Sequence, residues 1–219
     1  GSGFNIAMKD LEIRGAGDLL GGEQSGFIND IGFETYQKIL NEAIEELKET
    51  EFKNLYNEDI NTKEFVKEVT VDTDFSLLFP DDFVNNITER LSLYTQLNSL
   101  KTEPELELFE RDLIDRFGAL PTQVVDLLDS VRIKWLATTL GFEKIVMKQD
   151  RLIGYFISDQ DSRFYQSIHF SKVLQYVQAN PRLCTVKEKQ LRLGLRLLMS
   201  FPNIKSVQEG LEVLKPILL

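Results

Sequence analysis

The sequence predicts an α+β fold, with an N-terminal helical segment followed by a compact domain of three helices, then hairpins and further helices. Apolar residues recur at helical spacing up to about residue 141, and the period then shortens towards two, as in strands. Helices followed by hairpins favour an α+β arrangement over a doubly wound sheet. The chain has 219 residues, 42% of them hydrophobic, which is enough for a real core.

The first 64 residues differ in composition from the rest. Apolar spacing predicts a short helix over residues 4–12 and an amphipathic helix over residues 33–50. Eight of the 13 glycines fall in the first 32 residues, so residues 15–26 are predicted to be a glycine-rich loop. Residues 51–64 are polar, rich in Asn and acids, and are predicted to be a linker.

A strand and three helices are predicted next. The strand covers Val69 and Val71, with a possible extension over residues 75–79, and ends at Pro80. Asp81 or Asp82 would cap a helix to about residue 98. The run TEPE at residues 102–105 has capping-box spacing and opens a helix closed by Gly118, and a third helix runs from Pro121 to Gly141. The first helix has an apolar stripe at Phe83, Ile87, Leu91, Tyr94 and Leu97.

The last third is predicted to alternate between strands and helices. Residues 145–147 and 152–157 flank a polar turn and indicate a β-hairpin. A helix is expected near residues 171–179, followed by alternating stretches at 182–187 and 190–198. Residues 203–218 are predicted to close the chain as a helix that is interrupted by Pro216.

Charge is distributed unevenly and excludes some functions. The formal net charge is −10. Residues 131–219 nevertheless carry 14 Lys and Arg against 7 Asp and Glu. Such an acidic chain is a poor candidate for an independent nucleic-acid binder or a basic membrane-surface domain. The sequence has no apolar run of membrane-spanning length and no signal-peptide pattern, so a cytoplasmic location is expected.

Residues able to carry chemistry are scarce. A single cysteine, Cys184, excludes an internal disulfide and a cysteine-cluster zinc site, and His169 is the only histidine. No phosphate-binding GxxxxGK[ST] motif occurs. We therefore expect no catalytic residues, metal or cofactor in this chain, and a binding or regulatory role instead of a complete enzyme.

The glycine-rich loop holds the most informative residues. Arg14 is a permanent cation suited to phosphate or carboxylate, and Gln24 offers a donor and an acceptor ten residues later. Gly15 and Gly17 would let the backbone turn so that the two polar side chains share one site. Alternatively, Arg14 pairs with Asp18 or Glu23 and the glycines merely make turns.

Two blocks of sequence resemble a known family. The run GSGFNIAMKDLEIRGAGDLLGGEQSGFINDIGFETYQKIL resembles the end of the translocase module of bacterial transcription-repair coupling factors, the TRG motif, which the helicase RecG shares in looser form. The runs FPDDFVNNITERLSLYTQL and ELFERDLIDRFGALP resemble the C-terminal domain of the same family. The resemblance implies a fragment, with a translocation hook at residues 1–50, a linker at 51–64 and a C-terminal regulatory domain at 65–219.

The resemblance also implies roles for the hook. In the family, the Arg of the RGxG turn and the Gln of the following EQ pair convert ATP hydrolysis into movement along duplex DNA; they match Arg14 and Gln24, with Gly15 and Gly17 in the turn. The ATP- and magnesium-binding motifs of the family lie upstream, in the parent's translocase module. The fragment itself is therefore expected to have no ATPase activity.

The C-terminal domain is implied to be autoinhibitory. In the family it packs on an N-terminal UvrB-like module and masks the surface that recruits UvrA, while the parent also acts on RNA polymerase and duplex DNA. An acidic run fits a helix that faces a basic partner, although an ordinary exposed helix face is the simpler explanation of these particular residues. A RecG-like DNA-remodelling fragment and an unrelated acidic interaction module are the alternatives. The acidic run consists of Glu103, Glu105, Glu107, Glu110 and Asp112.

The remaining candidates have structural explanations. Asp81 and Asp82 are better explained as a helix cap than as metal ligands, His169 as a partly buried non-catalytic residue, and Cys184 as a small apolar residue. The basic stretch at residues 187–196 is predicted to be a strand with a solvated outer face. Ion pairs within the domain are expected for Arg90, Arg111 and Arg116.

Overall fold

The computed structural model describes residues 65–219, which form an α+β fold as the sequence predicts. These residues contain five α-helices, two short 3-10 helices (η1 and η2) and one five-stranded sheet. The two helices, the glycine-rich loop and the linker predicted before residue 65 lie outside the described residues. The elements are β1 Thr70–Thr73, α5 Ile87–Ser99, α6 Glu103–Phe117, α7 Thr122–Leu140, β2 Phe142–Lys148, β3 Arg151–Phe156, η1 Arg163–Gln166, α8 Ile168–Ala179, β4 Thr185–Leu191, β5 Gly194–Pro202, α9 Val207–Leu214 and η2 Lys215–Leu218.

The sheet has the strand order β1-β2-β3-β5-β4, and only β1 runs parallel to its neighbour. The predicted β2–β3 hairpin is confirmed. Its two turn residues, Gln149 and Asp150, both have positive φ (52° and 57°), as the tight turns that match strand twist require. The predicted stretch 190–198 spans the next turn, because β4 ends at Leu191 and β5 begins at Gly194.

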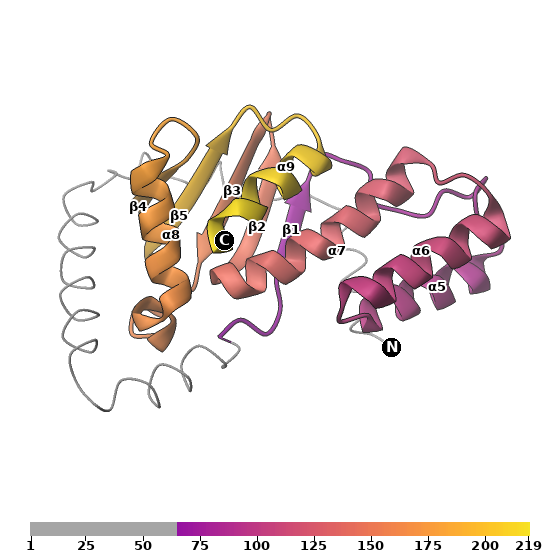
Figure 1. Ribbon diagram of the computed structural model, residues 1–219, viewed down its shortest axis with the longest axis horizontal. Coiled ribbons are helices and arrows are strands. Elements are labelled where there is room, and N and C mark those ends of the chain that lie inside the picture. The colour runs from indigo at the N-terminus through magenta and orange to yellow at the C-terminus, as the bar shows by residue number, and fades with distance from the viewer. Residues whose placement is uncertain (1–64) are drawn as a thin grey trace.

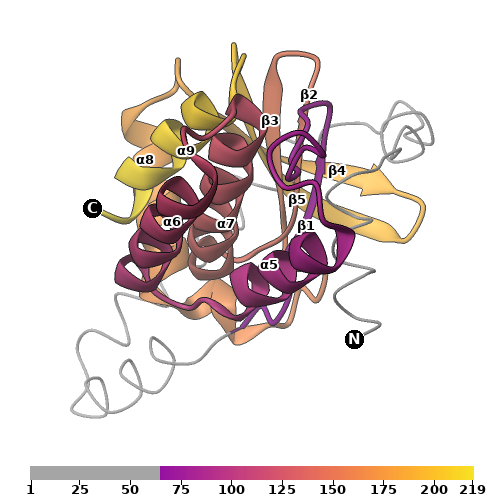
Figure 2. The ribbon, with the colours of Figure 1, turned by 90° about the vertical axis from the view of Figure 1, so that its right-hand side faces the viewer.

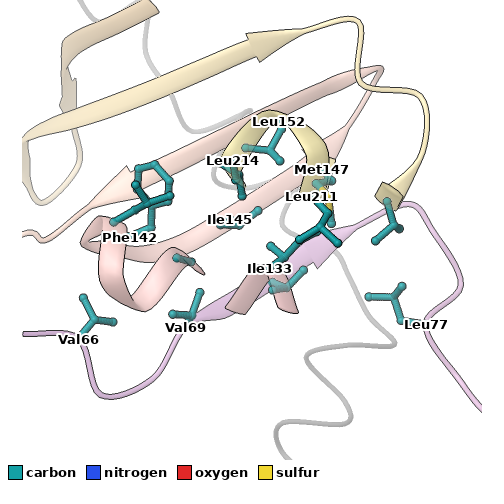
Figure 3. Packing of buried hydrophobic residues seen from close by; sticks show 14 of the residues in the cluster. Val66, Val69, Leu77, Ile133, Phe142, Ile145, Met147, Leu152, Leu211 and Leu214 are labelled. Carbon is teal, nitrogen blue, oxygen red and sulfur yellow. The ribbon is translucent and has the colours of Figure 1, made fainter. Parts of the chain in front are cut away.

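Helices α7, α8 and α9 lie together on one face of the sheet (Figure 1). A 90° turn of the view shows α7, α8 and α9 on one side of the strands (Figure 2). In the core between them, Leu211 and Leu214 of α9 lie over Ile145 and Met147 of β2 (Figure 3). One continuous hydrophobic cluster therefore joins the sheet to this helical cover.

Helices α5 and α6 extend the cover beyond the sheet and, with α7, form what we call the helical layer (Figure 1). The predicted start of α5 is wrong: the carbonyl of Pro80 accepts bonds from the backbone N–H of Phe83 and Val84, which closes a turn before the helix. The cap is Asn86, whose side chain accepts the N–H of Glu89 at 3.0 Å.

Two positions of the predicted α5 stripe are also wrong. Ile87 and Leu91 are exposed, whereas Tyr94 and Leu97 are buried as predicted, together with Leu93. Because the helix begins later than predicted, its first turn lies beyond the core and exposes its apolar side chains. The structure thus shifts the buried stripe towards the C-terminal half of α5.

Several other boundaries differ in detail. Residues 75–79 form no strand, and the backbone N–H of Phe79 instead donates to the Tyr94 hydroxyl at 2.8 Å. The capping box is incomplete, since the Thr102 side chain accepts no cap bond and Glu105 binds the Lys101 N–H at 2.8 Å. The closing helix is α9, which starts after Ser206 and gives way to η2 around Pro216.

The predicted closures of α6 and α7 are confirmed. Gly118 and Gly141 end these helices with φ of 92° and 80°. At Gly141 a second constraint applies, because a Cβ atom there would lie 2.2 Å from the ring of Phe164. This glycine lets α7 turn directly into β2 while Phe164 packs against the turn.

Candidate functional site

The predicted hook residues cannot be placed by the structure. Arg14, Gly15, Gly17 and Gln24 all lie before residue 65 and outside the described residues. Their coupling role stays a prediction. The other candidate is the acidic run, which the structure places on α6.

Helix α6 presents its acids to solvent. Leu106, Phe109 and Leu113 point into the core, so the opposite side of the helix faces outward. Glu103, Glu105, Glu107 and Asp112 are exposed and Glu110 is half-buried, which confirms a solvated acidic face. Asp115 adds an acid that the sequence interpretation did not include; it is exposed and makes no ion pair within residues 65–219.

Two apolar side chains interrupt this acidic face. Leu108 is 62% exposed and Ile114 is 45% exposed. Leu108 and Asp115 stand seven residues apart, so they share one side of the helix. We call the surface formed by Glu107, Leu108, Ile114 and Asp115 the α6 face. It combines apolar contact area with negative charge, a combination suited to a partner of opposite charge.

Arg132 of α7 anchors one end of α6. Its guanidinium contacts Glu103 at 2.8 Å, Asp129 at 2.9 Å and Glu110 at 3.7 Å. Burial lowers the pKa of Arg132, but the hydrogen bonds to Glu103 and Asp129 outweigh it, so the pKa is raised overall. Arg132 therefore keeps its positive charge and neutralises part of the acidic run from the side of α7. The acidic run is visible in the sequence, but the sequence does not indicate that Glu103 and Glu110 share the cation of Arg132.

The predicted ion pairs of three arginines are confirmed. Arg90 pairs with Asp81 at 2.7 Å, and Arg111 lies 3.8 Å from Glu107. Arg116 contacts Asp112 at 3.1 Å and also Glu89, which ties α6 to α5. The hydrogen bond to Asp112 is the main reason that the pKa of Arg116 is raised.

Asp81 and Asp82 are neither a helix cap nor part of a metal cluster. Both precede Asn86, the actual cap, and Asp81 serves Arg90 instead. Within residues 65–219 no group of three or more His, Cys, Asp or Glu side chains could hold a metal ion.

His169 and Cys184 occupy structural positions as predicted. His169 is half-buried at the start of α8, and its Nδ1 has no hydrogen-bond partner among residues 65–219. Cys184 is buried, and burial raises the pKa of its thiol to about 11. A thiol with this pKa is a poor nucleophile at neutral pH.

A small hollow lies beside the β4–β5 hairpin. Its volume is about 60 Å³, and it is lined by Ile157, Tyr165, Glu188 and Arg196, among others. Burial raises the pKa of Glu188. Cofactor and ligand pockets usually measure about 300–1,000 Å³, so this hollow is too small for a nucleotide.

Residues 73–167 match the family model of the TRCF domain, a stretch that runs from the end of β1 through α5, α6 and α7 to the start of α8. The class of protein is therefore one that carries a TRCF domain.

Similarity to individual relatives identifies a narrower family within this class. The chain is 43% identical over 145 residues to the transcription-repair-coupling factor of Escherichia coli (strain K12), covering 66% of this chain and 12% of the relative. It is 32% identical over 210 residues to that of Rickettsia prowazekii (strain Madrid E), covering 95% of this chain and 17% of the relative. The chain belongs to the family of transcription-repair coupling factors, and it spans less than a fifth of the length of these relatives.

A solved structure supports the same fold. The crystal structure of the C-terminal domain of a transcription-repair coupling factor aligns with a TM-score of 0.51 at 15% identity, covering 69% of this chain and 89% of that one. This confirms the predicted α+β architecture. Among residues 65–219, none of the helices has the length and apolar character needed to cross a membrane.

Proposed function

We propose that the chain is the C-terminal part of an ATP-dependent DNA translocase that removes stalled RNA polymerase and recruits nucleotide-excision repair. Within it, residues 1–50 form the hook and residues 65–219 form an autoinhibitory regulatory domain, joined by a linker at 51–64. The family supports this reading. The observation that carries the regulatory part is the α6 face, an exposed surface that is both acidic and apolar.

The hook couples ATP hydrolysis to movement along duplex DNA through Arg14 and Gln24. Gly15 and Gly17 allow the sharp turn that brings the two side chains together. ATP and magnesium bind in the upstream translocase module, which the hook contacts. The match to the Rickettsia prowazekii relative covers 95% of this chain and so extends over most of the first 64 residues, which supports this assignment.

Hook function is tested in the full-length parent protein with Arg14→Ala and Gln24→Ala. Each change should leave ATP and DNA binding within about twofold of the unaltered protein while abolishing displacement of a stalled RNA polymerase. A matched control is Arg111→Ala on α6, whose ion pair is exposed and which should translocate normally. Displacement that survives both hook changes would refute the coupling role.

The regulatory domain docks its α6 face on a basic surface of the N-terminal UvrB-like module and thereby masks the surface that recruits UvrA. Negative charge on α6 gives orientation and a favourable encounter with a basic partner, and Leu108 supplies apolar contact area at the same site. Arg132 stands behind the helix and leaves Glu107 and Asp115 facing outward.

Masking is tested by measuring UvrA capture with the full-length protein. Leu108→Ala combined with Asp115→Lys should weaken the docked state and raise UvrA capture by about tenfold, the effect of about 1.4 kcal/mol. Glu212→Lys, a charge reversal at an exposed position of α9, is the control and should leave capture unchanged. Equal capture by all three proteins would refute masking through α6.

A further inference from the structure

The face of the sheet that points away from the helices has its own composition. Strand pairing fixes which residues share it, because antiparallel partners in register point to the same side. We call this surface the open face. Its basic residues are Lys144, Lys148, Arg151, Lys187, Lys189 and Arg196, and its apolar residues are Val146, Ile153, Tyr155, Leu191 and Leu198.

The apolar residues form a second cluster, separate from the main core. Tyr155 is 0%, Val146 2% and Leu198 7% exposed, with Ile153 and Leu191 packed beside them. Helices α7, α8 and α9 all lie on the other side of the sheet (Figures 1 and 2). These three helices therefore do not lie over this strip.

Positive charge on the open face exceeds what the described residues neutralise. Asp72 of β1 pairs with Lys148 at 2.8 Å, and Glu143 pairs with Arg196 at 2.5 Å. Arg151 and Lys187 make no ion pair within residues 65–219. These two cations lie on different strands, β3 and β4, and they flank the apolar strip.

We propose that the open face is the docking site of the linker of this chain, residues 51–64. The linker carries four acids, Glu51, Glu58, Asp59 and Glu64, against Lys53 and Lys63. The apolar area that a segment could reach on the open face is that of Ile153 and Leu191, which are half-buried, because the other apolar residues of the strip are already buried. The apolar residues of the linker recur at helical spacing. They are Phe52, Leu55, Tyr56 and Ile60.

Chain connectivity favours this occupant over an external one. The described chain begins at Phe65, which packs against the main core, and it continues into β1, an edge strand of the sheet. A segment joined directly to this edge has an effective concentration of the order of millimolar at the sheet.

Peptide chemistry fits the open face better than nucleic acid does. Proteins that bind single strands offer exposed aromatic rings on which bases stack. Tyr155 is fully buried, and the Arg196 guanidinium lies 5.7 Å from the centre of its ring. The cations surround an apolar strip instead of a stacking surface, which suits an acidic amphipathic segment.

Docking would give the linker a defined role. This role rests on the proposed domain division. The docked linker fixes the orientation of the hook relative to the regulatory domain, so the two parts move as one unit until the linker is released. The inference concerns the contact between residues 51–64 and the sheet. Its test therefore needs neither ATP nor UvrA.

The test uses the whole chain and compares Arg151→Glu/Lys187→Glu with a control, Arg182→Glu/Lys205→Glu, that makes the same charge change at exposed positions outside the open face. The measurements are amide hydrogen exchange of residues 51–64 and cleavage by a glutamate-specific protease. In the first variant both rates should rise about tenfold, and in the control they should not change. Adding Glu58→Lys/Asp59→Lys to the first variant should restore slow amide exchange, which is the readout for this variant because it lacks the Glu58 cleavage site.

Three results would overturn the proposal. Residues 51–64 of the unaltered chain could exchange as fast as a free peptide of the same sequence. Protection could depend on protein concentration, which would make a second copy the occupant. A labelled single-stranded oligonucleotide could bind the unaltered chain and lose binding in Arg151→Glu/Lys187→Glu, which would make the open face a nucleic-acid surface. Loss of protection in a variant whose circular dichroism melt is unchanged, with rescue by the second pair of changes, supports docking.

Discussion

The α6 face and the open face of the sheet carry opposite charges and neutralise them differently. Most acids around α6 have an arginine of the helical layer within 4 Å, yet these pairs remain largely in solvent. On the open face Asp72 pairs with Lys148 and Glu143 pairs with Arg196, while Arg151 and Lys187 make no ion pair within residues 65–219. Solvent screens exposed pairs, so the α6 acids stay available to a partner of opposite charge, and Arg151 and Lys187 of the open face stay available to acids from elsewhere.

The helical layer and the helix-covered side of the sheet nevertheless share one hydrophobic cluster, and core substitutions test this most strongly. Phe156→Ala removes a buried ring whose centre lies 4.7 Å from that of Phe142, and Leu106→Ala truncates a buried side chain of α6. We expect a loss of about 3–5 kcal/mol for the first and about 2–5 kcal/mol for the second. Urea titration followed by fluorescence and by circular dichroism measures both.

Each variant should show one transition with a lower midpoint and an unchanged slope, because the cluster unfolds as a unit. If Leu106→Ala instead produced two separate transitions, the helical layer would be an independent unit. The comparison between α6 and the sheet would then concern two domains.

Cys184 tests how apolar the main core is. Its thiol pKa is raised from 9.0 to about 11 by burial. At pH 8 the thiolate fraction is therefore about a hundredfold lower than for an unperturbed thiol, and reaction with a disulfide reagent should slow at least in proportion. Reagent consumption by the folded chain, with the chain in urea as control, measures this.

The same shift predicts a dependence of stability on pH. A folded-state pKa above the unfolded value means that the stabilisation is complete below pH 9 and is lost as the pH rises towards 11. Cys184→Ala should remove this part of the alkaline decline. Rapid labelling at pH 8 would show that Cys184 is more accessible than its burial indicates.

Substitution of Arg132 tests how much its ion pairs stabilise the helical layer. Arg132→Met keeps most of the side-chain volume but leaves the buried carboxylate of Asp129 without its cation. We expect a loss of about 1–3 kcal/mol, measured as a shift of the urea midpoint. Arg111→Met, which breaks only an exposed pair with Glu107, is the control and should change stability by less than about 1 kcal/mol.

Sequence periodicity predicted the elements better than their ends. The helices closed by Gly118 and Gly141 and the hairpin around Gln149 were predictable because glycine and tight-turn chemistry act locally. The start of α5 was not, since Asp81 and Asn86 are both good caps and only tertiary packing selects between them.

The candidate surfaces were predictable to different degrees. The acidic run is visible in the sequence because its members stand close together. The open face is not, since its cations come from four strands whose pairing no local pattern reveals. Arg132 was missed for the same reason: it meets Glu103 from 29 residues away.

The smallest expected effect separates the two candidate caps of α5. Asp81→Ala removes an ion pair whose acid is 91% exposed, so the loss should be about 0–1 kcal/mol and should vanish in high salt. Asn86→Ala removes the bond to the Glu89 N–H and should cost about 1 kcal/mol at any salt concentration. Urea midpoints in low and high salt distinguish them. A larger, salt-independent loss for Asp81→Ala would return the cap to the position that the sequence favoured, and α5 would then begin in the turn after Pro80.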